Sequence, residues 1–313
     1  MQVVQLKPRS TRRPDATGPA DAQPVDAVPA DATIHPIGAQ AVVHSLLAAA
    51  GTAEFAPSIL DTQPWRWQLT GNTLTLYLDR GRIDDDVDAD GRLAILSCGA
   101  ALHHARIALE AEGWRLTMNR KTDPADPDQL ASLRLEERSP ADPADAPLIG
   151  SIPLRRTDRS PVTGAPITAA QLKAVTAAVR AEETSLHVLY PDEVVDLARV
   201  ASGARPAVSG SGDRSTGAGP ARLADDRGAT FALLYGHTDE PEDWLRAGEA
   251  LSAGWLTATA EGVSVLPLSA AVEGTATRQA VQIMIGCVGY PYLLLRLGRA
   301  PAPPARAVPR SPR

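Results

Sequence analysis

Residues 56–67 read Ala-Pro-Ser-Ile-Leu-Asp-Thr-Gln-Pro-Trp-Arg-Trp, and this stretch connects two predicted elements of different type. Before it, apolar residues between Gln40 and Ala50 recur at helical spacing, and Gly51 favours an end to that helix. After it, apolar and polar residues alternate on both sides of a Gly71-Asn72 turn, a pattern typical of a β-hairpin. The stretch is therefore predicted to be a helix-to-strand junction, dense in polar groups and indoles.

The composition predicts a globular protein. The chain has 313 residues, of which 44% are apolar and 22% charged, enough for a sizeable core. We expect no membrane association because no apolar run reaches twenty residues, and the net charge of −6 argues against a nucleic-acid partner. Cys98 and Cys287 have no metal-binding or redox spacing, so we expect both to be reduced and buried in a cytoplasmic protein.

Three segments lack the pattern of a folded element. Residues 1–35 have almost no large apolar side chains and are predicted to be a disordered tail. Residues 122–150 carry repeated Asp-Pro and Pro-Ala-Asp elements and are predicted to be a long connector. Residues 202–228 are rich in glycine and serine and are predicted to be a flexible loop.

Two long helices are predicted around these segments. The first, about residues 92–112, is apolar or small on nearly every side, which is typical of a buried helix. Its Cys98–Ala101 patch of small residues would let another backbone approach closely. The second begins near Pro241 and ends at Gly262. A capping box at residues 167–172 opens a shorter helix, and strands are expected at 186–190, 230–235, 263–266 and 292–297.

A second polar motif, Arg155-Arg156-Thr157-Asp158-Arg159, lies at the start of the second half of the chain. The last 39 residues also carry six arginines and no acidic residue. Guanidinium groups match phosphate oxygens in pairs, so either segment is suited to a phosphate group. The alternative interpretations are an exposed basic turn and a solvated basic tail.

The junction resembles the A-P-S-x-x-N-x-Q-P-W segment of the FMN-dependent nitroreductase superfamily, and the chain is most similar to its Acg-like actinobacterial branch, in which two nitroreductase halves are fused. The resemblance implies an α+β, nitroreductase-like fold. Two pseudo-symmetric halves, 36–150 and 151–313, would each have a mostly antiparallel sheet packed by helices, with the long buried helices at their interface. The protein would then be a monomer that mimics a homodimer.

The resemblance also implies a set of cofactor-binding residues from both halves. The basic motif is similar to the family's R-x-S-x-R phosphate motif, and the segment 262–269 is similar to the strand whose end faces the flavin. The halves would complement each other into one site, and the implied residues are Pro57, Ser58, Asp61, Gln63, Arg155, Arg156, Thr157, Arg159, Pro267, Leu268, Ser269, Arg306 and Arg310.

The function implied by the resemblance is reduction of nitroaromatic or quinone-like small molecules, with FMN as cofactor and NADPH or NADH as electron donor. No catalytic side chain is then required, because the flavin carries the chemistry, and no metal site is expected because His103 and His104 are adjacent and point to different faces. Asp61 stands where the family has Asn. Two alternatives stay open: a flavin-sequestering protein with little turnover, and a degenerate paralogue without flavin.

Overall fold

The computed structural model describes residues 4–6, 38–120, 125–139, 146–162, 164–203, 226 and 228–299. The elements of the first half are β1 (Val4–Leu6), α1 (Ala39–Ala53), the 3₁₀ helix η1 (Ile59–Asp61), β2 (Trp65–Thr70), β3 (Thr73–Leu78), the 3₁₀ helix η2 (Arg80–Arg82), α2 (Arg92–Ala111), β4 (Trp114–Asn119), β5 (Gln129–Arg138) and α3 (Ala146–Ser151). Those of the second half are α4 (Ala169–Ala181), β6 (Ser185–Val188), α5 (Pro191–Gly203), β7 (Thr230–Gly236), α7 (Pro241–Ala260), β8 (Val263–Leu268), α8 (Ala270–Glu273), α9 (Thr275–Met284) and β9 (Tyr290–Arg299).

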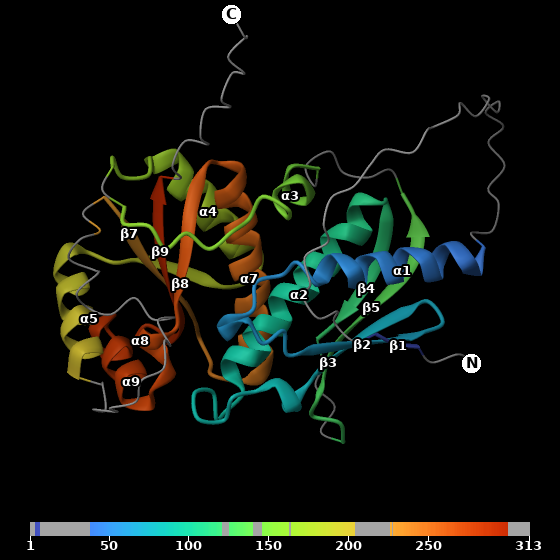
Figure 1. The fold of residues 1–313 in the computed structure, drawn as a ribbon, viewed down its shortest axis with the longest axis horizontal. Coiled ribbons are helices and arrows are strands. Elements are labelled where there is room, and N and C mark those ends of the chain that lie inside the picture. The colour runs from blue at the N-terminus through green and yellow to red at the C-terminus, as the bar shows by residue number, and fades with distance from the viewer. Residues whose placement is uncertain are drawn as a thin grey trace, which may run out of the picture.

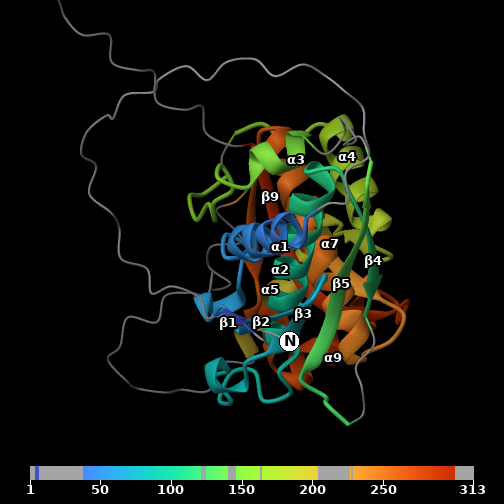
Figure 2. The same ribbon diagram turned by 90° about the vertical axis from the view of Figure 1, so that its right-hand side faces the viewer.

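The fold has two antiparallel sheets separated by a central pair of long helices (Figure 1). The first sheet has the strand order β1-β2-β3-β5-β4 and the second has the order β6-β7-β9-β8. Figure 2, which views the first half from its own side, shows α1 and α2 on one face of the first sheet. The predicted α+β class, with helices packed on mostly antiparallel sheets, is confirmed.

The two halves repeat one topology. Each has a helix, two strands, a long helix and two further strands, and apart from β1 the four strands of each sheet follow the same spatial order. The helices α2 and α7 are each 20 residues long and precede the third strand of their own sheet. The pseudo-symmetry that the resemblance implies is therefore present in the structure.

The central helices α2 and α7 touch backbone to backbone. A Cβ placed on Gly99 would lie 1.9 Å from the carbonyl oxygen of Leu245, and one on Gly248 would lie 1.8 Å from that of Leu96. Only glycine allows such an approach, which confirms the predicted role of the small-residue patch. Leu96 of α2 packs into the core of the second half and Leu245 of α7 into that of the first, so the halves share their cores.

Several predicted elements are confirmed. The β2–β3 hairpin pairs Trp65 with Leu78 and Trp67 with Leu76 around the predicted turn. Thr168 and Gln171 form the predicted capping box at the start of α4. A separate observation is that the helices the structure describes include none that is both long and apolar enough to cross a membrane.

Other predictions are corrected by the structure. Within the tail predicted to be disordered, Val4–Leu6 pairs with the open edge of β2, whose backbone groups accept another strand. The predicted connector 122–150 contains β5 and α3, because Leu133 and Leu135 alternate with charged residues and turn inward. Cys98 is buried as expected, but Cys287 is exposed. The predicted loop 202–228 lies outside the described residues except at 202–203, 226 and 228.

Candidate functional site

A cavity of about 340 Å³ brings together the three segments that the sequence singled out. This volume is within the usual range of about 300–1,000 Å³ for small-molecule sites. The residues that line it come from the junction, the basic motif, α7 and the end of β8, and they are Ala56, Pro57, Ser58, Ile59, Asp61, Arg155, Thr157, Arg159, Trp255, Leu266, Pro267 and Ser269. Both halves contribute to the cavity, as the complementary motifs predicted.

The junction wall is a tight turn held by two hydroxyl groups. The Ile59 amide donates to Oγ of the buried Ser97 at 2.9 Å, and the Gln63 amide donates to Oγ of Ser58 at 3.1 Å. Asp61 and Gln63 have left-handed φ values of 56° and 46°, which L residues seldom adopt. Such strain persists only where the surroundings impose it, and it concentrates at functional sites.

The basic motif is anchored to the second sheet. Thr157 forms a bridge with Val265 of β8, and the buried guanidinium of Arg296 donates to the carbonyl oxygens of Asp158 and Ser160 at 2.7 and 2.8 Å. Arg296 is itself fixed by a buried ion pair with Asp226 at 2.9 Å. The motif is thus anchored at the cavity, although Arg156, Thr157 and Arg159 are themselves exposed, as in the alternative of an exposed basic turn.

Arg155 is a partly buried residue of this wall. Its Nη2 donates to the Phe55 carbonyl oxygen at 3.2 Å and its guanidinium lies 4.6 Å from the centre of the Trp255 ring. Its Nε is buried without a hydrogen-bond partner, and burial lowers the pKa of the guanidinium to about 10. Among the described residues, neither Arg155 nor Arg159 forms an ion pair. An anionic ligand would supply the missing counter-charge.

The third wall is the end of β8 together with α7. Leu266 and Pro267 belong to the strand, and Ser269 follows it with its hydroxyl donating to Oε1 of Glu273 at 2.6 Å. Trp255 of α7, 2% exposed, completes this wall. The sequence did not identify Trp255 as a site residue, because a single Trp at helical spacing does not distinguish a core position from a cavity wall.

Some predicted site residues do not line the cavity. The Gln63 side chain forms a hydrogen bond beside the junction, in which Nε2 donates to the Glu54 carbonyl oxygen at 3.0 Å. Arg156 is exposed beside the motif, and Leu268 is buried in an outer core cluster with residues of α5 and α9. Arg306 and Arg310 lie outside the described residues.

The pseudo-symmetric position in the other half is occupied by ion pairs instead. Arg106 follows Gly99 in α2 by the same seven residues that separate Trp255 from Gly248 in α7. Likewise Arg120 comes directly after β4, as Ser269 comes directly after β8.

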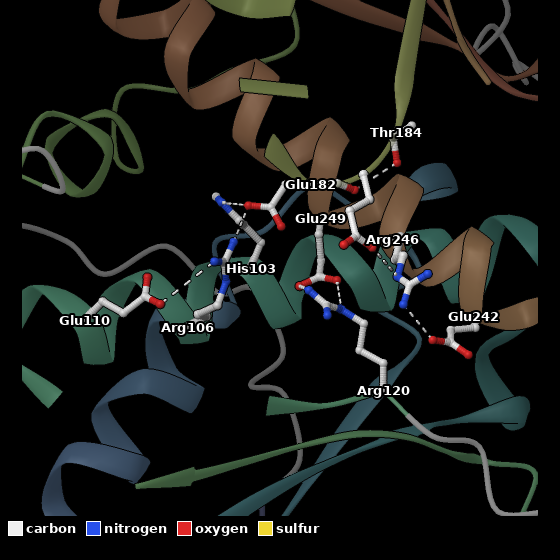
Figure 3. Close-up of polar contacts among 10 residues, drawn as sticks. His103, Arg106, Glu110, Arg120, Glu182, Thr184, Glu242, Arg246 and Glu249 are labelled. Atoms are coloured by element: carbon white, nitrogen blue, oxygen red, sulfur yellow. Dashed lines mark hydrogen bonds and ion pairs between the residues drawn. The ribbon is translucent and has the colours of Figure 1, made fainter. Parts of the chain in front are cut away.

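Figure 3 shows both arginines of this position held by carboxylates. Arg106 pairs with Glu182 of the α4–β6 junction, and Arg120 binds the fully buried Glu249 with contacts of 2.6 and 3.2 Å. Beside them, Nδ1 of His103 lies 2.9 Å from Oγ of Ser252. The cations of this position are paired with carboxylates, whereas Arg155 and Arg159 of the cavity form no ion pair with the part of the chain that the structure describes.

The chain is similar to named proteins of Mycobacterium tuberculosis. It is 35% identical over 295 residues to "Putative NAD(P)H nitroreductase Rv3131", covering 82% of this chain and 86% of the relative. It is 32% identical over 309 residues to "Putative NAD(P)H nitroreductase acg", covering 82% and 90%.

The similarity to solved structures is weaker. A solved NADPH:FMN oxidoreductase from Vibrio harveyi, complexed with NAD+, is 16% identical with a TM-score of 0.37 over 53% of this chain and 74% of that one. No protein-family model matches the chain.

Proposed function

The chain belongs to the nitroreductase family of these two mycobacterial relatives, and on that premise we propose that it is an FMN-dependent oxidoreductase. It would use NADPH or NADH to reduce nitroaromatic or quinone-like acceptors. The observation that carries the proposal is a pair of arginines, Arg155 and Arg159, that form no ion pair with a described residue and line a cavity whose opposite wall is the strained junction. Cationic, donor-rich walls of this kind fit the phosphate of a flavin mononucleotide.

The residues that line the cavity suit FMN in their hydrogen-bonding groups as well as in their charge. Arg155, Arg159 and the Thr157 hydroxyl would hold the phosphate, because each presents donors to the same cavity. Pro57, Ser58 and Asp61 would meet the flavin from the junction side, with Pro267 and Ser269 on the β8 side. The bound flavin would supply the hydride chemistry, and the protein would supply orientation.

We further propose one FMN per chain and a monomeric protein. A monomer is supported by the cores that the two halves already share, and a single FMN is supported by the contrast between the two pseudo-symmetric positions. At the cavity the arginines lack carboxylate partners among the described residues, whereas at the related position Arg106 and Arg120 are paired with Glu182 and Glu249. A second phosphate would have to break these pairs, and separating one partner of a buried pair costs about 3–5 kcal/mol.

Charge reversal at the basic motif tests the proposed cofactor. Arg155→Glu and Arg159→Glu each remove a charge-assisted contact of about 1.5–3 kcal/mol and add repulsion, so both should abolish retention of FMN. Arg156→Glu is the matched control, because Arg156 is exposed and does not line the cavity.

The measurement is flavin absorbance per chain after incubation with excess FMN and gel filtration, with circular dichroism to check folding. The proposal expects retention by the wild type and the Arg156 variant only. Equal retention of FMN by all four proteins would place the phosphate elsewhere. Loss of FMN from the Arg156 variant as well would show that the change in net charge, and not the position of the arginine, causes the loss.

A second candidate function is flavin binding with little turnover, and Asp61 is the observation that favours it. A carboxylate lines the cavity where the family has an amide, and a negative charge near the ring disfavours the anionic reduced flavin. Rapid mixing of the FMN-loaded protein with NADPH and NADH separates the candidates. Reduction followed by turnover with a quinone supports the reductase, whereas flavin that stays oxidised supports the binding protein.

A further inference from the structure

Asp61 carries a negative charge that no described residue neutralises. It lines the cavity, and within the described chain its carboxylate forms neither a hydrogen bond nor an ion pair, although Arg155 and Arg159 line the same cavity. The side chain is exposed, so water can solvate the charge while no ligand covers it. The cavity therefore presents charges of both signs that the described residues leave unpaired.

The backbone of the junction holds Asp61 in place. Its φ of 56° is left-handed, and its amide donates to the Ser58 carbonyl oxygen at 3.2 Å. The Gln63 amide, which donates to Oγ of Ser58, closes the same turn. Asn and Asp adopt the left-handed conformation more readily than other L residues except glycine, and Asn would do so without a charge. The turn therefore explains the position of residue 61 but not its charge.

Ser269, on the β8 side of the cavity, is also a hydrogen-bond acceptor toward a ligand. Its hydroxyl proton is donated to Oε1 of Glu273 at 2.6 Å, so its oxygen has only lone pairs left to offer. Glu273 places a second carboxylate one hydrogen bond away from the cavity, and it forms no ion pair with a described residue. Asp61 and Ser269 can thus accept hydrogen bonds from a ligand, but neither has a proton to donate.

The cavity walls therefore differ in what they offer a ligand. The basic motif offers donors, and a flavin phosphate would take them, whereas Asp61 and Ser269 offer acceptors. A second ligand that covers Asp61 displaces the water around its carboxylate, and a charge that loses water without gaining a partner is unfavourable. A cation beside the carboxylate avoids this penalty through a charge-assisted hydrogen bond. An anion at the same place would add repulsion.

We infer that Asp61 is a specificity-determining residue, which makes the cavity favour aromatic acceptors that carry an alkylammonium group over anionic acceptors of the same shape. The inference rests on the proposed function, since it names the class of acceptor that the flavin-loaded cavity takes. The carboxylate of Asp61 pairs with the ammonium group, and the Ser269 oxygen accepts a second hydrogen bond from the same side of the ligand.

The experiment compares three ligands that share a nitrobenzene ring and differ in charge: para-nitrobenzylamine, para-nitrobenzyl alcohol and para-nitrobenzoate. Their dissociation constants are measured from the change in flavin absorbance of the oxidised, FMN-loaded full chain, without an electron donor, so that no turnover occurs. The variants are Asp61→Asn, which removes the charge, and Asp61→Glu, which keeps it. Asp85→Asn is the matched control, because Asp85 is exposed and does not line the cavity.

The inference expects the wild type to bind the amine about tenfold more tightly than the benzoate, with the alcohol between them. Asp61→Asn should weaken binding of the amine by about fivefold and leave the alcohol unchanged, whereas Asp61→Glu and Asp85→Asn should keep the preference. Screening at about 1 M salt should reduce the preference of the wild type. This salt dependence and the order of the three ligands provide a result even if Asp61→Asn does not retain FMN.

Several results would overturn the inference alone. Wild-type protein that holds FMN but binds the three ligands equally well, or binds none of them, lacks the claimed preference. An equal loss of affinity for all three ligands in Asp61→Asn would make Asp61 a contact of the ring, and the same shift in Asp85→Asn would assign the preference to net charge. If the wild type retains no FMN after loading, the proposed function fails first and the inference fails with it.

Discussion

Replacement of Gly248 by alanine tests the contact that joins the two halves. The new Cβ would lie 1.8 Å from the Leu96 carbonyl oxygen and 2.9 Å from Cα of Gly99, whereas real Cβ contacts are essentially never below 3.0 Å. Both neighbours are helix backbone, so no side-chain rotation relieves the clash. The helices α2 and α7 must therefore move apart along a contact that both hydrophobic cores share.

The cost follows from the size of this displacement. Overpacking a core by one methyl group usually costs about 1–3 kcal/mol, and a clash between two helix backbones belongs at the upper end. We expect Gly248→Ala to lower the free energy of unfolding by about 3 kcal/mol. Each kcal/mol of destabilisation lowers the melting temperature by about 2–4 °C for chains of 150–250 residues, and by slightly less for a longer chain such as this one. A decrease of about 5–10 °C is therefore expected.

Differential scanning calorimetry of the purified chain measures this decrease, and Gly51→Ala provides the matched control. Gly51 also lies in a helix, but a Cβ there would meet nothing within 4 Å. Helix propensity alone should make this variant up to about 1 kcal/mol more stable. If Gly248→Ala melts within 1–2 °C of the wild type, or together with Gly51→Ala, the close approach of α2 and α7 is refuted.

Three further predictions concern single polar groups. Asp61→Asn should raise the midpoint potential of bound FMN, measured by dye-linked redox titration, because it removes a negative charge beside the ring. Each 1.4 kcal/mol of relative stabilisation of the reduced flavin is a tenfold shift in its equilibrium with the oxidised form. Equal potentials for the two proteins would mean that Asp61 points away from the ring. His104 binds protons near pH 6.5 in the unfolded chain but only near pH 3 in the fold, so below pH 6.5 stability should fall by up to about 1.4 kcal/mol per pH unit. Urea titrations between pH 7 and lower pH should show a smaller loss of unfolding free energy for His104→Leu than for the wild type. Identical dependence of stability on pH in the two proteins would contradict the burial of a neutral ring. Asp226→Ala strands the buried Arg296 and should cost about 3–5 kcal/mol in urea unfolding, whereas a change below 1 kcal/mol would exclude the pair as an anchor of the basic motif.

Local patterns in the sequence predicted the elements whose signal lies in neighbouring residues. The β2–β3 hairpin, the capping box at Thr168 and the buried helix α2 follow from alternation, capping chemistry and composition over a few turns. The strand β5 had the same kind of signal, since Leu133 and Leu135 alternate with charged residues. It was missed because the Asp-Pro elements on both sides dominated the interpretation.

Contacts between distant residues were not predictable from one sequence. Arg106 and Glu182 are 76 positions apart, and Arg120 and Glu249 are 129 apart, so no local pattern links them. Trp255 lines the cavity because α7 packs beside the basic motif, which only the folded chain reveals. The motifs thus indicated which segments meet, and the fold determined which side chains of each segment reach the cavity.

The most direct test of the account is the flavin content of the protein. The full chain is incubated with excess FMN, freed of unbound ligand, and its flavin absorbance is divided by the protein concentration from amino-acid analysis. We predict one FMN per chain, because only one of the two pseudo-symmetric positions has arginines left without carboxylate partners among the described residues. Two FMN per chain would contradict the inference that the ion-paired second position takes no phosphate, and no FMN would contradict the proposed function itself.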